Sequence, residues 1–224
     1  MNTFKMPYAK SETTASRILD AALELFRSKG FDETTMRDIA TAAGMATGAA
    51  YHHFPSKNAM VMAFYQRACD EMQPLLEAAL VDARGLEQQL VALIRTKLDY
   101  FRPHRVVLKA LLKDGADPQH PLSPFSSETR AIRATDVAWF RRILTGVSVP
   151  KELSAHLPDL LWLFQMGVIY FWITDPSPKQ KRTTRLLEIS AKVVVSLIRL
   201  AGLPFARPLR RPVIELIEVV KGDE

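Results

Sequence analysis

The sequence predicts an all-α protein, in which an N-terminal three-helix domain precedes a larger helical domain. Apolar residues recur every three to four positions in nearly every segment, which is the period of an α-helix, and no stretch alternates as a β-strand does. Glycine and proline separate these segments at short intervals. With 224 residues, of which 48% are hydrophobic, the chain can bury the core of one or two domains.

The first two helices have clear end signals. Apolar spacing predicts the first helix over residues 14–29, and Gly30 follows it. Thr35 can cap the second helix, and Asp38 can return the hydrogen bond as in a capping box. Gly44 can end that helix, because glycine adopts the left-handed geometry of a helix C-terminus without a Cβ penalty.

A third, short helix follows this glycine directly. It begins at about Ala46, and Pro55 limits it near Phe54, so it has roughly two turns. Its outward side chains are short or polar rather than typical of a core. A capped helix, a glycine turn and a second short helix are the local pattern of a helix-turn-helix.

The rest of the chain predicts further helices. We expect them from Lys57, capped by Ser56 and kinked near Pro74, and over 86–101, 106–113, 126–145, 157–174 and 177–203, with a proline-rich loop over 114–125 and an extra helix within 204–224. The segments 157–174 and 177–203 flank a short proline-marked turn, which predicts two antiparallel neighbours.

The segment 177–203 carries two apolar stripes. One comprises Leu186, Ile189, Val193, Leu197 and Leu200, and the other Leu187, Ala191, Val194, Ile198 and Ala201. A helix with two apolar faces has two partners. One is its own domain. The other is either the equivalent helix of a second copy, in a four-helix interface around a twofold axis, or a further helix of the same domain.

Composition narrows the class of protein. The net charge of +6 suits a nucleic-acid partner, although residues 1–57 hold seven Lys and Arg against six Asp and Glu, a net charge of +1. Cys69 is the one cysteine, which excludes a disulfide within the chain and fits a cytoplasmic protein. There is no signal-peptide pattern, and the longest apolar stretch, Leu160 to Ile173, is shorter than the ~20 residues of a membrane span.

Sequence motifs of catalysis are missing as well. The chain has no phosphate-binding glycine loop, no metal-ligand spacing and no nucleophile motif. His52 and His53 are adjacent and point about 100° apart on a helix, so they are unsuited to sharing a metal. We therefore expect neither an enzyme nor a metal or other cofactor.

The N-terminal residues also match a known pattern. An Ile-Ala pair, an Ala-Gly turn, a glycine, an aromatic cluster and a Ser-Lys pair follow one another as Ile39-Ala40, Ala43-Gly44, Gly48, Tyr51-His52-His53-Phe54 and Ser56-Lys57. This segment, from about Thr14 to Phe64, resembles the DNA-binding domain of the TetR (tetracycline-repressor-like) family of transcriptional regulators. Two residues depart from the pattern. Ala46 replaces a hydroxyl residue at the start of the recognition helix, and Ala50 replaces a larger aliphatic residue.

The resemblance implies a DNA-binding domain over residues 1–57, which binds a palindromic double-stranded operator. The predicted contacts are Ala46, Thr47, Gly48, Ala49 and His52 on the recognition helix, with Thr47, Ala49 and His52 facing bases, and Thr35, Tyr51, His53 and Lys57 at phosphates. Simpler interpretations stay open: Tyr51 packs in the core, the two histidines form a solvated helix end, and Lys57 is an ordinary surface lysine. Thr35 has an independent structural role as a cap, so its loss can affect folding as well as binding.

The resemblance further implies that residues 58–224 bind a small-molecule effector and form a homodimer. The candidate effector-binding residues are Phe64, Phe101, His104, Trp139, Phe140, Trp162 and Phe164, and the candidate dimer residues are Phe164, Val168, Trp172, Leu186, Ile189, Val193 and Leu197. An aromatic lining favours an apolar effector, whose binding releases a repressor from DNA. The alternative is a helical regulator that binds another protein without specific DNA binding.

Overall fold

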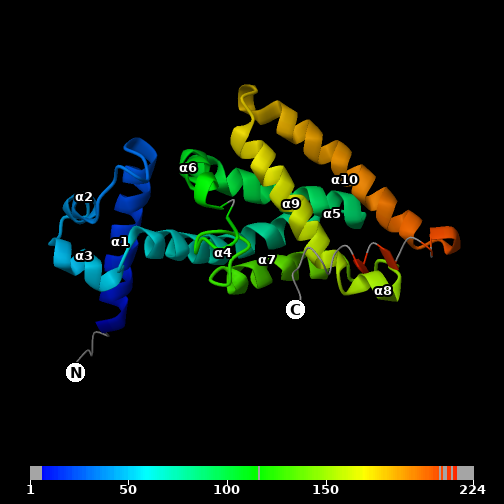
Figure 1. Ribbon diagram of the computed structural model, residues 1–224, viewed down its shortest axis with the longest axis horizontal. Helices are drawn as coiled ribbons and strands as arrows, with labels where there is room; N and C mark the ends of the chain where they lie inside the picture. The colour runs from blue at the N-terminus through cyan, green and yellow to red at the C-terminus, as the bar shows by residue number, and fades with distance from the viewer. Residues whose placement is uncertain (1–6, 116, 207, 209–210, 213, 216–224) are drawn as a thin grey trace. The chain divides into compact units, whose positions relative to one another are not determined.

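The computed structural model describes residues 7–115, 117–206, 208, 211–212 and 214–215, without the side chains of 7–12, 113–114 and 206. Figure 1 shows its α-helices, which are α1 (Pro7–Ser28), α2 (Met36–Ala42), α3 (Thr47–His53), α4 (Lys57–Val81), α5 (Gly85–Phe101), α6 (Arg105–Gly115), α7 (Arg130–Ile143), α8 (Lys151–Ser154), α9 (Leu157–Thr174) and α10 (Lys181–Ala201). No strand occurs among these residues, so the predicted all-α fold is confirmed. Most of the predicted C-terminal helix lies outside them.

The chain divides into two compact units. The first comprises Met1–Asp70 and Arg102–Ile132, and the second comprises Glu71–Phe101 and Arg133–Glu224. The helix α4 contributes to both units and continues through Pro74. The sequence predicted a boundary at residue 57 between a DNA-binding domain and an effector-binding and dimerisation domain, whereas the compact units divide the chain elsewhere. The functional boundary stays a prediction.

The first unit is built around α1. One face of α1 is buried through Ile18, Ala22 and Phe26, against α2 and α6. The short helices α2 and α3 pack on each other, as Figure 1 shows, and Ala50 is the buried residue of α3. Because both helices are only seven residues long, packing and caps rather than helix propensity must hold them in place.

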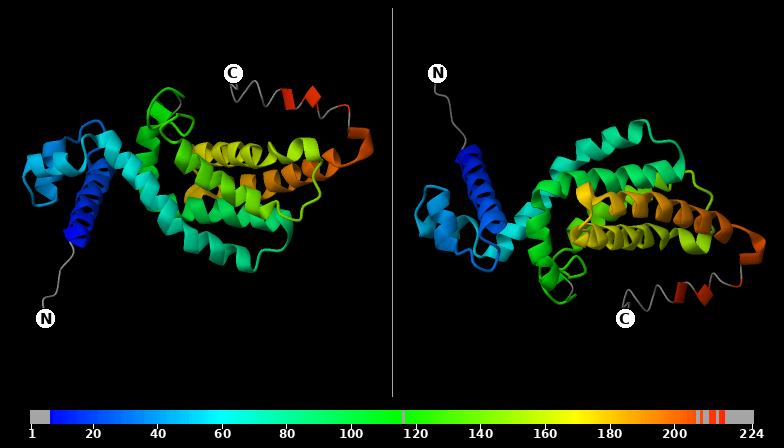
Figure 2. Two further views of the ribbon diagram at one scale, coloured as in Figure 1. Left: turned by 90° about the horizontal axis from the view of Figure 1, so that it is seen from below. Right: turned by 90° about the horizontal axis from the view of Figure 1, so that it is seen from above.

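The second unit is a helical bundle. Its helices α9 and α10 run antiparallel side by side in both views of Figure 2, and α5 packs against each of them. Asp175 fixes the turn between α9 and α10. Its carboxylate accepts hydrogen bonds from the Ser177 backbone N–H at 2.9 Å and from the Thr183 hydroxyl at 2.7 Å. Burial raises the pKa of Asp175, but these hydrogen bonds outweigh it and hold the pKa well below its usual value.

The helix α9 has the length and composition of a membrane span. Its mean hydropathy is 1.3, and 44% of it is buried inside the chain. A helix in the core of a protein that folds in water has the same length and composition, so α9 is weak evidence for a membrane.

The structure separates the two apolar stripes of α10. Leu187, Ala191 and Ile198 are buried in the second unit, together with Val195 rather than the predicted Val194. The other stripe, at 37–58% exposure, comprises Leu186, Ile189, Val193, Leu197 and Leu200. We call these five residues the outer stripe. In α4, Leu76 is buried and its neighbour Leu75 is exposed.

Candidate nucleic-acid interface

The start of α2 is fixed by a capping box. The Thr35 hydroxyl accepts a hydrogen bond from the Asp38 backbone N–H at 3.1 Å, and the Asp38 carboxylate accepts one from the Thr35 N–H at 2.9 Å. The ammonium of Lys29, the residue that follows α1, donates to the same carboxylate at 2.6 Å. The Lys29 hydrogen bond, followed by those from Thr35, lowers the pKa of Asp38 to about 2. The predicted cap is therefore confirmed.

The turn between α2 and α3 is held by the backbone. Gly44 has a φ of 68°, the left-handed geometry that the sequence predicted. The N–H of Met45 donates to the carbonyl of Ala40 at 2.9 Å, and the N–H of Gly44 to that of Thr41 at 3.0 Å. These two bonds form a Schellman motif, which satisfies carbonyls at the end of α2 and aims the chain into α3.

Arg17 adds a tertiary contact that the sequence did not predict. Its guanidinium donates from α1 to the carbonyl of Ala43 at 2.8 Å, directly beside the turn. An exposed arginine on a helix carries no local signal of such a contact, because its partner lies 26 residues away. Arg17 thus orients the turn relative to α1.

The exposed face of α3 carries mostly small side chains. Ala46, Gly48 and Ala49 are exposed with small side chains, and Ala46 makes no side-chain cap, as expected for its departure from the family pattern. The remaining predicted residues lie on the same short helix: Thr47 and His53 are half-buried, His52 is exposed, and Tyr51 is 51% exposed. The exposure of Tyr51 argues against a ring that only fills the core.

Lys57 has a structural role that was not predicted. Its ammonium donates to the carbonyl of Phe31 at 2.5 Å and of Asp32 at 3.2 Å, and it lies 4.6 Å from the centre of the Phe31 ring. Lys57 therefore ties the start of α4 to the loop that follows α1. It is more than a solvated surface lysine, and its contact with a phosphate stays a prediction.

The predicted effector-binding residues are divided between the units. In the first unit, Phe64 and His104 have ring centres 4.8 Å apart. In the second unit, Phe140 and Trp162 are buried and Phe101, Trp139 and Phe164 are half-buried. The guanidinium of Arg142 lies 5.1 Å from the Trp139 ring, so this tryptophan is covered by a surface cation.

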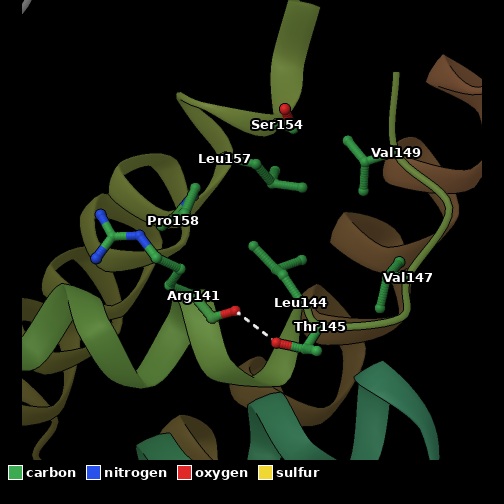
Figure 3. A pocket seen from close by; sticks show the side chains of 8 residues that line it. All are labelled: Arg141, Leu144, Thr145, Val147, Val149, Ser154, Leu157 and Pro158. Carbon is green, nitrogen blue, oxygen red and sulfur yellow. Dashed lines mark hydrogen bonds between the residues drawn. The ribbon is translucent and has the colours of Figure 1, made fainter. Parts of the chain in front are cut away.

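The structure has a small pocket in another place. Figure 3 shows it in the second unit, with a volume of about 210 Å³, lined by Leu144, Val147, Val149, Leu157 and Pro158, and by Arg141, Thr145 and Ser154. None of the predicted effector-binding residues lines this pocket. In Figure 3 the Arg141 guanidinium points away from the apolar side chains, and Thr145 donates to the Arg141 carbonyl at 3.5 Å. The pocket is therefore mostly apolar.

The predicted dimer residues fall into two groups. Leu186, Ile189, Val193 and Leu197 belong to the exposed outer stripe, and Phe164 on α9 is half-buried. Val168 and Trp172 differ from the prediction, because they are 3% and 2% exposed and belong to the core of their own unit. The sequence did not distinguish Phe164 from Val168 and Trp172, because most residues around α9 are apolar.

A buried ion pair in the second unit was not predicted. Lys97 on α5 is 2% exposed, and its ammonium donates to the Asp136 carboxylate on α7 and to the Gln165 side-chain carbonyl on α9, the latter at 2.6 Å. The Gln165 amide nitrogen in turn donates to Asp136 at 2.6 Å. The sequence signals were a lysine within an apolar helix face and a glutamine within the longest apolar run.

Comparison with known proteins agrees with this geometry. Residues 18–64 match the model of "Bacterial regulatory proteins, tetR family", and residues 89–218 match that of "Tetracyclin repressor-like, C-terminal domain".

Two curated relatives and one solved structure illustrate the similarity. The chain is 34% identical over 84 residues to the HTH-type transcriptional repressor KstR2 of Rhodococcus jostii, which is 38% of this chain and 41% of that protein. It is 35% identical over 153 residues to the HTH-type transcriptional regulator SrpR of Pseudomonas putida, which is 66% of this chain and 68% of that protein. The structure of the transcriptional regulator FadR of Bacillus subtilis in complex with stearoyl-CoA matches this chain with a TM-score of 0.62 at 16% identity. The match covers 84% of this chain and 98% of that protein, which shows a shared fold.

Proposed function

The chain belongs to the TetR family of bacterial transcriptional regulators, and from this membership we propose that it binds a palindromic operator as a homodimer and represses transcription until a small, largely apolar effector releases it. It is a DNA-binding regulator with a helix-turn-helix, and not an enzyme. A regulator of bacterial transcription acts where the DNA is, which supports a cytoplasmic location.

The exposed face of α3 carries the proposal for DNA binding. Its small side chains let the backbone come close to base edges in the major groove, while Thr47 and His52 offer hydrogen-bonding groups. The capping box fixes the start of α2, and the glycine turn joins α2 to α3 in a defined geometry, so little order has to be gained on binding. Thr35, Tyr51, His53 and Lys57 supply the proposed phosphate contacts around it.

Dimerisation follows from the limited reach of α3 and from the outer stripe. Two helical turns touch few bases, so two copies about 34–36 Å apart are needed to read successive major grooves. Five exposed aliphatic side chains along one helix form a surface that a soluble monomer rarely leaves uncovered. A second copy of α10 covers it in the proposed dimer, with half-buried residues of α9 such as Phe164 at its edge.

Effector binding belongs to the second unit in this proposal. The effector lowers DNA affinity by preferring the conformation in which the two recognition helices no longer match the operator. The apolar side chains of this unit, including Phe140, Trp162 and those of the small pocket, support an effector with a largely apolar body.

Binding to labelled duplexes from the region upstream of its own gene tests the proposal. We expect a palindromic duplex to bind with a Kd of about 10⁻⁸ M or tighter, and the affinity to fall about 10³-fold between 50 and 200 mM salt. Tyr51→Phe removes only the phenol hydroxyl and should weaken binding to all duplexes about equally. Weak binding that is indifferent to sequence would instead favour a regulator that acts on another protein.

A further inference from the structure

The second unit holds a carboxylate between two buried donors. The ammonium of Lys97 donates to one oxygen of Asp136, and the amide nitrogen of Gln165 donates to the other at 2.6 Å. Lys97 and Gln165 are 2% and 1% exposed, and a hydrogen bond of 2.6 Å joins their side chains. Three different helices supply these groups, so the arrangement is a formed site rather than a local turn.

A stable core does not require this arrangement. Transferring a lysine from water into a helical core is unfavourable, and replacing a buried ion pair by apolar residues of similar volume is often neutral or stabilising. The ring of Phe140 lies 4.9 Å from the Lys97 ammonium, so one side of this buried cation faces an aromatic ring. A buried charge with a specific partner in such surroundings is a candidate functional group.

The partners differ in their freedom to leave. The side chain of Asp136 is 22% exposed, whereas that of Lys97 is 2% exposed. Asp136 can turn its carboxylate toward water, but Lys97 cannot reach water without opening the bundle. An incoming carboxylate that takes the place of Asp136 leaves the lysine paired, because one anion replaces another on the same two donors.

We propose that Lys97 and Gln165 form a binding site for the carboxylate of the effector, and that Asp136 occupies this site when no effector is bound. This inference rests on the proposed function, and it names the effector class as an organic acid with an apolar body. Residues one helical turn from the three polar groups are apolar and buried, namely Leu93, Phe140 and Leu161. The body of the acid would contact them.

The mechanism couples binding to the arrangement of the helices. Asp136 accepts the hydrogen bonds that the buried donors of α5 and α9 direct to α7. When the effector displaces it, α7 loses this tie while the two donors keep a carboxylate. A shift of α7 relative to α5 and α9 is then the two-state change that the effector favours.

Chemical rescue tests the site without DNA. Asp136→Ala removes the internal carboxylate and leaves Lys97 buried without its anion, so we expect Tm to fall by about 10 °C. Sodium acetate at 100 mM should restore about 4 °C of this loss, whereas sodium chloride of the same ionic strength should not. The double variant Lys97→Met/Asp136→Leu keeps the volume without the charges, and its Tm should not respond to acetate.

Failure to fold does not remove this test. If Asp136→Ala is unfolded in chloride, the yield of helical protein on refolding, followed by circular dichroism, should rise in acetate and not in chloride. Equal melting or refolding in the two salts overturns the proposal, because a site with two free donors would take up the small anion.

Straight-chain acids of four to eight carbons test the wild-type chain. We expect at least one acid to raise the wild-type Tm and to weaken DNA binding, whereas the alcohol of the same length does neither. Lys97→Gln should lose this response. If no acid raises Tm more than its alcohol, the effector proposal is wrong. If acids raise Tm but no duplex binds specifically, the acid site stands and the DNA proposal fails.

Discussion

The helices α3 and α10 each leave one face uncovered, and the two faces differ in chemistry. The uncovered face of α3 consists of small and polar groups, with a single large side chain, Tyr51, among them. The uncovered face of α10 is the outer stripe of five aliphatic residues. A face of small and polar side chains can approach bases and phosphates closely and form hydrogen bonds with them, whereas an aliphatic stripe packs against another protein surface. The comparison shows that exposure alone does not define a partner.

The two faces are also supported differently. The position of α3 depends on its packing against α2 and on hydrogen bonds that Arg17 and Lys57 donate to nearby backbone carbonyl groups. The position of α10 depends on the packing of its buried residues, which are Leu187, Ala191, Val195 and Ile198. It depends also on Asp175 in the preceding turn, which accepts a hydrogen bond from the Thr183 N–H. Substitutions on the outer surfaces of both helices can therefore test function without unfolding the chain.

The largest expected effect is the loss of the dimer on Leu197→Arg. This residue is 58% exposed, so the fold should be retained, but a charge placed twice in an apolar interface should weaken dimerisation about 1000-fold. Sedimentation equilibrium at micromolar concentration measures this change, and operator affinity should fall with it. Lys192→Glu, a charge change at an exposed position of α10 outside the outer stripe, is the control. A wild-type chain that is already monomeric would refute the dimer.

The next effect concerns Ala49→Glu on α3. A carboxylate on this exposed face should repel the phosphate backbone and block approach to the bases, which should weaken operator binding about 100-fold. Fluorescence anisotropy gives the affinity, and thermal unfolding should stay within about 2 °C of wild type because the position is exposed. Ser28→Glu adds the same charge at the end of α1 and should bind DNA nearly as the wild type does.

Two substitutions of Thr35 distinguish its role as a helix cap from its proposed role as a phosphate contact. Thr35→Ala removes the hydroxyl, so we expect the free energy of unfolding to fall by about 1 kcal/mol and DNA affinity to fall as well. Thr35→Asp keeps a good cap but adds a negative charge. It should retain most of the stability and still lose DNA affinity about tenfold. Urea denaturation and anisotropy measure the two quantities, and parallel changes in both variants would mean that Thr35 acts only as a cap.

The smallest effect is the pH dependence of the capping box. The pKa of Asp38 in the folded chain is about 2, below the value of ~3.9 expected in the unfolded chain. The ionised carboxylate therefore favours the folded state above about pH 4, and this contribution disappears as the pH falls to about 2. Urea denaturation of Asp38→Asn should show a loss of stability at pH 5 that shrinks toward pH 2.5. Glu33→Gln, the same loss of charge at a neighbouring exposed acid, provides the baseline.

Prediction from the sequence succeeded best where signals are local. The cap at Thr35, the left-handed Gly44 and the bounds of α9 were found because their determinants lie within a few residues. The start of α7 was placed four residues early. Residues 123–129 instead form a hydrogen-bonded turn, in which the Thr129 hydroxyl donates to the Ser123 carbonyl at 2.7 Å. Hydroxyl side chains that bind nearby backbone compete with a helix, and periodicity alone does not show this.

The sequence by itself determined the all-α fold, the helix-turn-helix and the two apolar stripes of α10, because periodicity and helix-end signals depend on residues a few positions apart. Only the tertiary structure decided which stripe is covered, where Lys97 finds its anion and how Arg17 reaches the turn. The contacts of these two cations join residues that are 26 to 68 positions apart. Such pairs are selected by the packing of whole helices, and no local pattern encodes them.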